Sequence, residues 1–399
     1  MKINTDSKKI KDILIRGVDR VIEEESLIKK LKSGRKLKIK HGVDPTTKDL
    51  HLGHAVIYEK LRRFQNAGHQ IIFLIGDFTG RFGDPAQKME VRRLRSKKEV
   101  RKMAKNYLRQ AGKILDFSKL EVRYNSEWFD KMSAEELLRL MSYFTTKRIL
   151  ERDMFQERER RGQEIRFHEP VYPILQAYDT VVLKADVEIG GSDQLFNFLK
   201  GRDLQKYFNQ IPQDILTIKL LIGTDGEKKM SQSLDNYIGI EENSNEQYGK
   251  IMSIPDSLIF DYFELVSRIP LSEIQRLKKM LKEKKVNLRD LKAKLAREIV
   301  KIYHSEKAAK KAEEEFNRVF KEKKLPSKIP EVKIKEKALN VLDLLVKTEL
   351  TSSKSEAKKL VLQKGVKIEG KTEKDWRKLI KIKKGLIVQV GKRKFIKII

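Results

Sequence analysis

The chain has 399 residues, with 88 Lys and Arg against 57 Asp and Glu, which gives a formal net charge of +31. It has no cysteine, which excludes disulfides, thiolate zinc sites and cysteine nucleophiles. Its length predicts two or three domains, and its 39% apolar residues suffice to build their cores. Because no secretory signal or membrane-length apolar run is visible, we expect a soluble, cytoplasmic protein with no membrane partner.

Short apolar segments alternate with amphipathic helical segments through the first half of the chain. Strand, helix, strand with crossover-length connections predicts a doubly wound parallel sheet, that is, a Rossmann-like α/β fold. The expected strands are 37–41, 70–75, 119–124 and 215–221, and the expected helices are about 51–67, 97–115 and 134–154.

From about residue 244 to 320 the apolar period is helical, and Ser272 with Gln275 predicts a capping box. A charged segment with two prolines, 321–330, is typical of a linker. We therefore expect a Rossmann-like domain over 1–228, a loop and an α-helical domain over 229–330, and a small α+β domain over 337–399.

The expected last domain is strongly basic. It has 18 Lys and Arg against 6 Asp and Glu, a net charge of +12 in under a sixth of the chain. Ser353 and Glu356 predict a capping box there, and strands are expected at 366–368, 386–390 and 395–399. This charge favours a polyanion such as RNA, and a solvated basic surface is the alternative.

Asp44-Pro45-Thr46 and then His51-Leu52-Gly53-His54 stand where the first strand ends and a helix begins. The unpaired N–H groups of a helix N-terminus suit phosphate, and Gly53 leaves room for a flat ring near the backbone. Alone, this motif is weak, since two histidines three residues apart are equally compatible with a structural or metal-binding role.

A second segment, 225–233, contains Gly226, Lys228 and Lys229 and ends in Met230-Ser231-Gln232-Ser233. Glycine, lysine and hydroxyl groups in one loop are the composition of a mobile phosphate clamp. By itself the segment is better explained as a solvated surface loop.

The two segments in this order, followed by a basic tail, resemble the HIGH and KMSKS signatures of class I aminoacyl-tRNA synthetases. Further segments are similar to bacterial tyrosyl-tRNA synthetases over essentially the whole chain, and the tail is similar to their S4 RNA-binding module. The segments that carry this resemblance are 42–46, 83–85, Tyr172 with 176–179, 190–194, 353–357 and 365–368.

The resemblance implies a tyrosine–tRNA ligase that activates L-tyrosine with ATP and transfers it to tRNA(Tyr). Asp84, Tyr172 and Gln176 would hold the ammonium group, and Asp179 would accept the phenolic hydrogen. Gly191 and Asp193 would meet the ribose, and Gln194 would lie near the reacting carboxylate. The implied catalytic residues are His51, His54, Lys228 and Lys229, and the other implied ATP contacts are Asp44, Thr46, Gly53, Met230, Ser231 and Gln232.

The sequence departs from the family pattern at three positions. Lys40 stands where many members have a tyrosine that shares the substrate hydroxyl, so it either points elsewhere or donates to the phenolic oxygen. Ile57 lacks the hydroxyl that some relatives place near the adenylate. Gln232 replaces the second lysine of the signature, which removes one positive charge from the loop.

The family resemblance also implies partners. Mg²⁺ would arrive with ATP, and no protein-bound metal or organic cofactor is expected. A homodimer is expected from the family alone. The α-helical domain and the tail are both expected to bind tRNA. The tail residues expected to contact it are Lys354, Lys358, Lys359, Arg377, Lys392 and Arg393.

Three other readings remain open at this point. A tryptophanyl-tRNA synthetase shares the fold and both signatures. A non-catalytic RNA-binding protein on a synthetase scaffold is compatible with Lys40 and Gln232. Small-molecule nucleotidyltransferases use a similar histidine turn, but they do not need a basic RNA tail.

Overall fold

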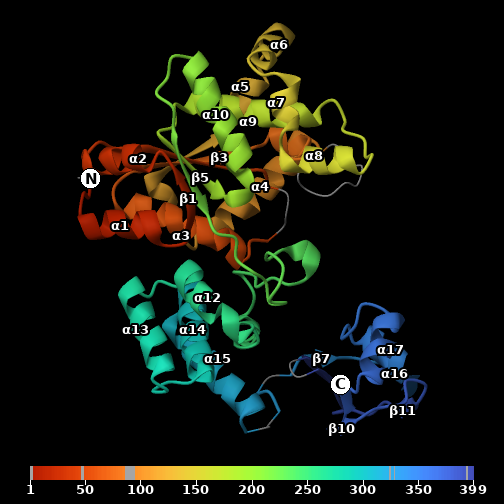
Figure 1. Ribbon diagram of the computed structural model, residues 1–399. Coiled ribbons are helices and arrows are strands. Elements are labelled where there is room, and N and C mark those ends of the chain that lie inside the picture. The colour runs from red at the N-terminus through yellow and green to blue at the C-terminus, as the bar shows by residue number, and fades with distance from the viewer. Residues whose placement is uncertain (1–2, 46–48, 86–94, 323–324, 328, 392–393) are drawn as a thin grey trace. The chain divides into compact units, whose positions relative to one another are not determined.

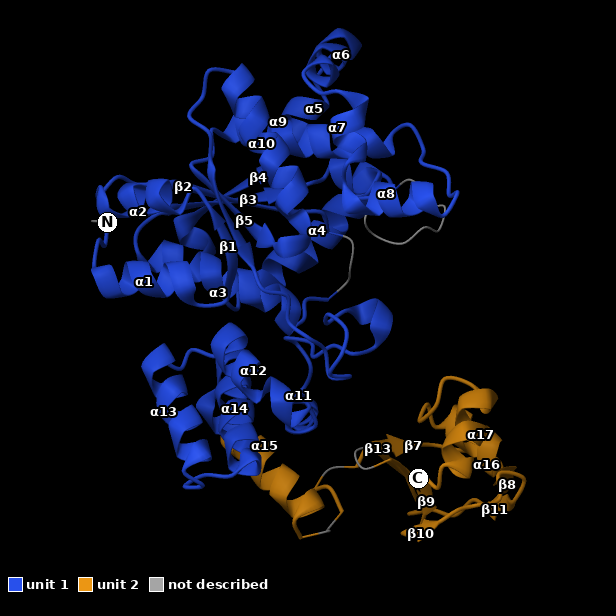
Figure 2. Cartoon of the chain, viewed as in Figure 1, with its two compact units in different colours: residues 1–309 blue, residues 310–399 orange. Residues whose placement is uncertain are grey.

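The computed structural model describes residues 3–45, 49–85, 95–322, 325–327, 329–391 and 394–399. The chain forms two compact units, residues 1–309 and 310–399 (Figure 2). Their boundary falls inside helix α15 (Glu306–Phe320), before the expected linker at 321–330. The expected division of the first unit at residue 228 stays a prediction.

A six-stranded sheet with the order β1-β6-β5-β2-β3-β4 lies at the centre of the first unit (Figure 1). All neighbouring pairs are parallel except β1 and β6, so the expected parallel α/β fold is confirmed. The strands are β1 (Val18–Ile22), β2 (Lys38–Val43), β3 (Gln70–Ile75), β4 (Leu120–Tyr124), β5 (Val187–Gly191) and β6 (Asp214–Ile218).

The inner strands are buried on both faces, which is what helices on each side of a parallel sheet produce. Every residue of β5 and β6 is buried, and only the first residue of β3 is not. The helices of this part of the unit are α1 (Ser7–Ile15), α2 (Glu24–Lys32), α3 (Leu52–Asn66), α4 (Lys97–Ala111), α5 (Ser126–Phe129), α6 (Ala134–Ser142), α7 (Thr146–Leu150), α8 (Asp153–Arg160), α9 (Tyr172–Leu183) and α10 (Leu195–Tyr207).

The expected helical segment from 244 onward is also confirmed. α11 and α12 pack against α14, and α12 also packs against α3 below the sheet. The helices are α11 (Ser244–Met252), α12 (Ile259–Val266), α13 (Leu271–Lys282), α14 (Leu288–Tyr303) and α15. None of the described helices is both long and apolar enough to cross a membrane.

The second unit has its own core, formed by two helices and short strands. Its strands pair in the order β10-β9-β12-β13-β7, and β8 pairs with β11. The elements are β7 (Glu331–Val332), β8 (Ala338–Asn340), α16 (Val341–Lys347), α17 (Lys354–Leu362), β9 (Val366–Ile368), β10 (Lys371–Thr372), β11 (Leu379–Lys381), β12 (Ile387–Val390) and β13 (Lys394–Ile398).

Several local expectations were wrong. The single helix expected at 134–154 is three helices, because the Thr145 hydroxyl accepts a hydrogen bond from Arg148 N and starts a new helix there. The Ser272 capping box is absent, since α13 begins after Pro270 with no side-chain cap. Ser353 does cap α17, but Glu356 accepts from Ser352 N instead of from Ser353 N.

Candidate active site

A cavity of about 520 Å³ opens at the carboxyl ends of β2 and β5, beside the N-terminus of α3. Here the chain runs from β2 to β3 on one side, while β5 pairs with β2 on the other. In open α/β sheets, ligands bind at such a reversal of strand order. The predicted residues that line the cavity are Lys40, Asp44, His51, Gly53, His54, Asp84, Tyr172, Gln176, Asp179, Gly191, Asp193, Gln194, Lys229, Met230, Ser231 and Gln232.

Asp179 lies on α9, and only 3% of its surface is exposed. Trp128 Nε1 donates to its Oδ1 at 3.0 Å, and Asn125 Nδ2 donates to its Oδ2 at 3.4 Å. Burial raises the pKa of Asp179 to about 7, and the positive charge of Lys40 is the largest influence in the opposite direction. A carboxylate keeps further acceptor lone pairs, so this group can take the hydrogen of a substrate hydroxyl.

Asp44 lies at the end of β2 and is held by two hydroxyl groups. Thr79 Oγ1 donates to its Oδ1 at 2.8 Å, and the Tyr172 hydroxyl donates to its Oδ2 at 3.0 Å. Burial raises the pKa of Asp44 to about 7. Position 76, next to Asp44, accommodates only glycine, because a Cβ there would lie 1.9 Å from Asp44 Oδ1.

Asp84 forms an ion pair that the sequence did not reveal. Arg152 Nη1 lies 3.0 Å from Asp84 Oδ1, and Arg152 Nη2 donates to Oδ2 at 3.1 Å. Both side chains are 5% exposed. Gln194 Nε2 also donates to Oδ2, at 3.1 Å. Asp84 is therefore paired with a buried guanidinium, and its Oδ2 accepts two hydrogen bonds.

An amide links two other predicted residues. Asn197 Nδ2 donates to Gln176 Oε1 at 2.8 Å and to Gln194 Oε1 at 3.0 Å. Sequence reasoning missed Asn197, Arg152, Thr79, Asn125 and Trp128. A weak signal existed for Thr79 and Asn125 alone, because each follows the carboxyl end of a sheet strand.

The two histidines form the start of α3. His51 is its N-cap and accepts a hydrogen bond from Gly53 N at 3.1 Å, while His54 Nδ1 accepts from His51 N at 3.3 Å. Burial lowers the pKa of His51 to about 4 and that of His54 well below its usual range. Both rings are therefore neutral at pH 7, and each can donate one N–H hydrogen bond.

The 225–233 loop reaches the cavity through its second half. Lys229 Nζ lies 3.4 Å from Asp193 Oδ2, and Gln232 Nε2 donates to the Asp49 carbonyl oxygen at 2.9 Å. Met230 is buried, whereas Lys228 is exposed and does not line the cavity. Thr46 lies outside the described residues.

Lys40 turns its ammonium group toward the neighbouring strand. It is fully buried, and its Nζ lies 2.7 Å from Glu188 Oε1 on β5. It also donates to Thr180 Oγ1 at 2.7 Å and to the Gln176 carbonyl oxygen at 3.4 Å. From the sequence, Lys40 was expected either to point elsewhere or to donate to a substrate hydroxyl. In the structure its ammonium group points elsewhere, toward Glu188 and Thr180.

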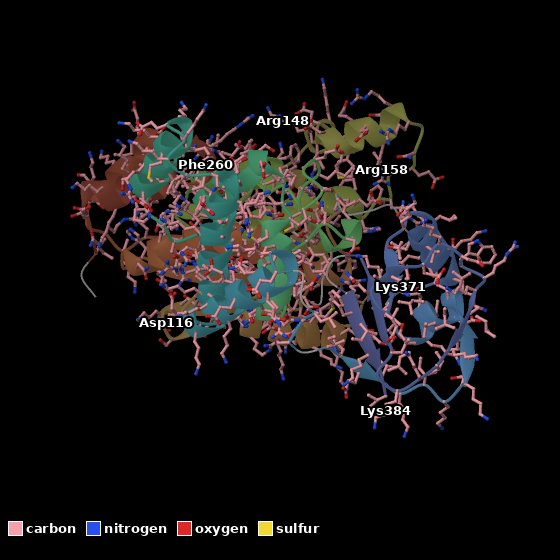
Figure 3. The ribbon with its side chains drawn as sticks, turned by 90° about the horizontal axis from the view of Figure 1, so that it is seen from below. Asp116, Arg148, Arg158, Phe260, Lys371 and Lys384 are labelled. Atoms are coloured by element: carbon pink, nitrogen blue, oxygen red, sulfur yellow. The ribbon has the colours of Figure 1, made fainter. Side chains whose placement is uncertain are left out.

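The basic residues of the second unit have varied surroundings. Lys354 Nζ lies 2.6 Å from Asp343 Oδ1. Lys358 Nζ and the Arg377 guanidinium lie 4.6 Å and 4.5 Å from the centre of the Trp376 ring. Lys359 is exposed, as are Lys371 and Lys384 (Figure 3), and Lys392 and Arg393 lie outside the described residues.

The parallel sheet, the switch-point cavity and the two signature segments on its rim are the arrangement expected of a class I synthetase. A family model described as tRNA synthetases class I (W and Y) matches residues 32–321, and a model of the C-terminal domain of tyrosine–tRNA ligases matches 321–398. The two models together span nearly the whole chain.

Comparison with curated relatives shows which of the class I families the chain belongs to. A tyrosine–tRNA ligase of Thermotoga maritima is 46% identical over 386 residues, covering 97% of this chain and 96% of the relative. One of Mannheimia succiniciproducens is 48% identical over 385 residues, covering 96% and 97%. The chain belongs to the bacterial tyrosyl-tRNA synthetase family, and the tryptophanyl and non-catalytic readings are not favoured.

Solved structures agree on the fold. A tyrosyl-tRNA synthetase of Archaeoglobus fulgidus, complexed with L-tyrosine, matches with a TM-score of 0.62 and 23% identity, covering 77% of this chain and 99% of the other. A truncated mitochondrial tyrosyl-tRNA synthetase of Aspergillus nidulans gives 0.65 and 23%, covering 78% and 94%. At these identities the likeness supports the fold alone.

Proposed function

We propose that the chain activates L-tyrosine with ATP, releasing pyrophosphate, and then transfers the tyrosyl group to the 3′ end of tRNA(Tyr). The choice of tyrosine as the amino-acid substrate rests on the buried Asp179. Trp128 and Asn125 donate hydrogen bonds to it in the cavity that is also lined by the two histidines. A buried acceptor of this kind penalises phenylalanine, because without a substrate hydroxyl the carboxylate would keep only its hydrogen bonds from Trp128 and Asn125, and a further acceptor site would stay unsatisfied.

The ammonium group of tyrosine is assigned to Asp84 and Gln176. A carboxylate and an amide oxygen are both acceptors, as a cation with three donors requires. Gln194 lies next to Asp84 and is assigned to the reacting carboxylate. Tyr172 is assigned an additional role, since its hydroxyl donates to Asp44 and thereby orients that carboxylate.

ATP is assigned to the rim formed by α3 and the 225–233 loop. Gly191 and Asp193 would meet the ribose, and a Cβ on Gly191 would lie 2.6 Å from Asp193 Oδ1. The neutral His51 and His54 would donate to phosphate oxygens at the helix N-terminus. Asp44, Thr46, Gly53, Met230, Ser231 and Gln232 complete the proposed ATP contacts.

The substrate carboxylate attacks the α-phosphorus directly, so no protein base is required. Catalysis then consists of positioning and of stabilising charge on the phosphates. Lys229 would move from Asp193 to the leaving pyrophosphate, and the exposed Lys228 would assist it. The described residues contain no group of three or more His, Asp or Glu that could hold a metal ion. Mg²⁺ is assigned to the phosphates of ATP, because this ion is commonly bound through substrate phosphates and one or two carboxylates.

The second unit is proposed as an RNA-binding arm. Its net charge of +12 over residues 337–399 supports phosphate contacts, which position an RNA without reading its sequence. The candidate contacts are Lys354, Lys358, Lys359, Arg377, Lys392 and Arg393.

We also propose a homodimer in the cytoplasm. Exposed apolar side chains support the dimer: Tyr207 and Phe208 are 55% and 40% exposed, their ring centres lie 5.0 Å and 5.8 Å from that of Tyr143, and Ile211 is 83% exposed. Large apolar side chains gathered at the surface are typical of interfaces. Ile211→Glu should convert a dimer to a monomer in light scattering, and an unchanged mass would argue against this surface.

The activation step is tested by amino-acid-dependent ATP–pyrophosphate exchange with tyrosine, phenylalanine and tryptophan. Exchange with tyrosine alone is expected. Exchange with tryptophan would overturn the choice of amino acid, and no exchange by folded protein would overturn the proposed activity.

A further inference from the structure

A buried ion pair lies behind the proposed tyrosine pocket. Lys40 on β2 and Glu188 on β5 are direct partners in the parallel ladder, and their side chains are 0% and 1% exposed. Glu188 is further held by the Thr180 hydroxyl, which donates to Oε2 at 3.1 Å, and by the amide of Gln213. The pair is thus the centre of a buried polar cluster that connects β2, β5 and α9.

This cluster is hydrogen-bonded to α9, the helix that contains the proposed substrate contacts Gln176 and Asp179. Lys40 donates to the side chain of Thr180 and to the main-chain carbonyl of Gln176, which are four residues apart on α9. That turn of α9 also contains Asp179, which faces the cavity. One ammonium group therefore ties β2 to the turn that presents both Gln176 and Asp179.

Stability alone does not account for a charged pair at this place. Desolvating two ions costs several kcal/mol, and replacing a buried pair by apolar residues of similar volume is often neutral or stabilising. Lys40 also lines the cavity, so its charge acts directly on whatever the cavity holds.

We infer that Lys40 is a positioning residue for recognition of the substrate phenol. Its anchor on Glu188 and Thr180 fixes the turn of α9 that contains Asp179, and its positive charge favours the carboxylate form of Asp179. This inference rests on the proposed function and explains how the pocket recognises a phenol although Lys40 replaces the tyrosine found in many relatives.

The surroundings of Asp179 support this role of the charge. On the β4 side it meets the neutral donors Trp128 and Asn125. Asp44 from the end of β2 adds a carboxyl group, while Tyr172 from its own helix is a phenol that burial keeps neutral by raising its pKa. Burial and Asp44 both raise the pKa of Asp179, and Lys40 opposes them. Without this cation, the protonated form would be more populated, and a protonated carboxyl accepts a phenolic hydrogen poorly.

The test uses paired variants of the full chain. Lys40→Met alone would leave Glu188 buried without its cation, so the informative change is the double variant Lys40→Met/Glu188→Met, which is neutral and similar in volume. Lys30→Met/Asp214→Asn is the matched control, because it removes another ion pair of the same unit, between Lys30 on α2 and the buried Asp214 on β6, with a separation of 2.9 Å.

The readout is kcat/KM for tyrosine divided by kcat/KM for phenylalanine, measured from pH 5 to 8 in pyrophosphate exchange. Phenylalanine does not use the Asp179 acceptor, so the ratio isolates that residue. In the double variant the acid limb of the ratio should move up by about one pH unit, which is about a tenfold loss below the midpoint. In the control the limb should stay where it is in the wild type.

A shift of the midpoint in the double variant alone would not follow from a loosened pocket, which would lower activity with both amino acids. The inference is overturned if the ratio and its midpoint in the double variant stay as in the wild type, or if the control shifts by the same amount. Failure of the wild-type chain to exchange with tyrosine would instead refute the proposed function, so the two failures are distinguishable.

Discussion

Lys229→Ala tests the proposed role of the 225–233 loop, and the structure predicts little effect on folding. The Lys229–Asp193 pair is 3.4 Å long and both side chains are about half exposed, at 57% and 43%. Exposed pairs of this kind contribute about 0–1 kcal/mol. For a protein of this size that corresponds to a change in Tm of roughly 2–4 °C at most.

The expected effect on catalysis is much larger. If Lys229 donates to the leaving pyrophosphate, its removal costs a contact made chiefly in the transition state, worth about 3–4 kcal/mol. At about 1.4 kcal/mol per tenfold change in rate, kcat for adenylate formation should fall by roughly 10²–10³. Tyrosine affinity should be unchanged, because Lys229 contacts Asp193 and not the residues around Asp179.

Single-turnover formation of tyrosyl-adenylate measures the rate, and calorimetric titration measures tyrosine binding. Lys206→Ala is the matched control, since it removes the same charge from an exposed position in the last turn of α10. An unchanged rate in Lys229→Ala, or an equal loss in Lys206→Ala, would refute the assignment. Weaker tyrosine binding with an unchanged kcat would place Lys229 in the amino-acid site instead.

Three further outcomes are expected. Burial raises the pKa of Asp44 from 3.8 to about 7, so the folded state binds this proton more tightly than the unfolded state and stability falls as pH rises through that window. Asp44→Asn should remove this loss, at most about 4 kcal/mol, from ligand-free melting curves between pH 4 and 8, and parallel curves would contradict it. Arg152→Ala leaves Asp84 without its buried cation and should destabilise the ligand-free protein by about 3 kcal/mol. The ammonium group of bound tyrosine can replace the guanidinium, so tyrosine should raise the Tm of this variant more than that of the wild type. Equal Tm shifts would place the ammonium group elsewhere. Truncation to residues 1–320, which retains α15, should preserve adenylate formation but weaken tRNA charging. Because phosphate contacts are lost, tRNA binding by the truncated chain should depend less steeply on salt than binding by the full chain, whereas full charging at moderate salt would exclude the tail as the RNA arm.

Local patterns in the sequence were sufficient for much of this protein. The strand expected at 70–75 is β3 to the residue, because a short run of apolar residues bounded by turn residues has one good solution in a buried parallel sheet. The histidine motif and the 225–233 loop were recognised as a pair, because each has a local composition suited to phosphate. The resemblance of the chain to tyrosyl-tRNA synthetases, and of its tail to their S4 module, followed from such segments.

Contacts between distant residues decided the rest. Arg152 donates to Asp84 and Trp128 donates to Asp179, although they are 68 and 51 residues away in the chain. No periodic pattern in the local sequence indicates these contacts. The direction of the Lys40 side chain depends on the register of β2 against β5, which places Glu188 beside it. A sequence states which groups are charged, but burial and pairing set their energies, and those arise only when the strands and helices pack together.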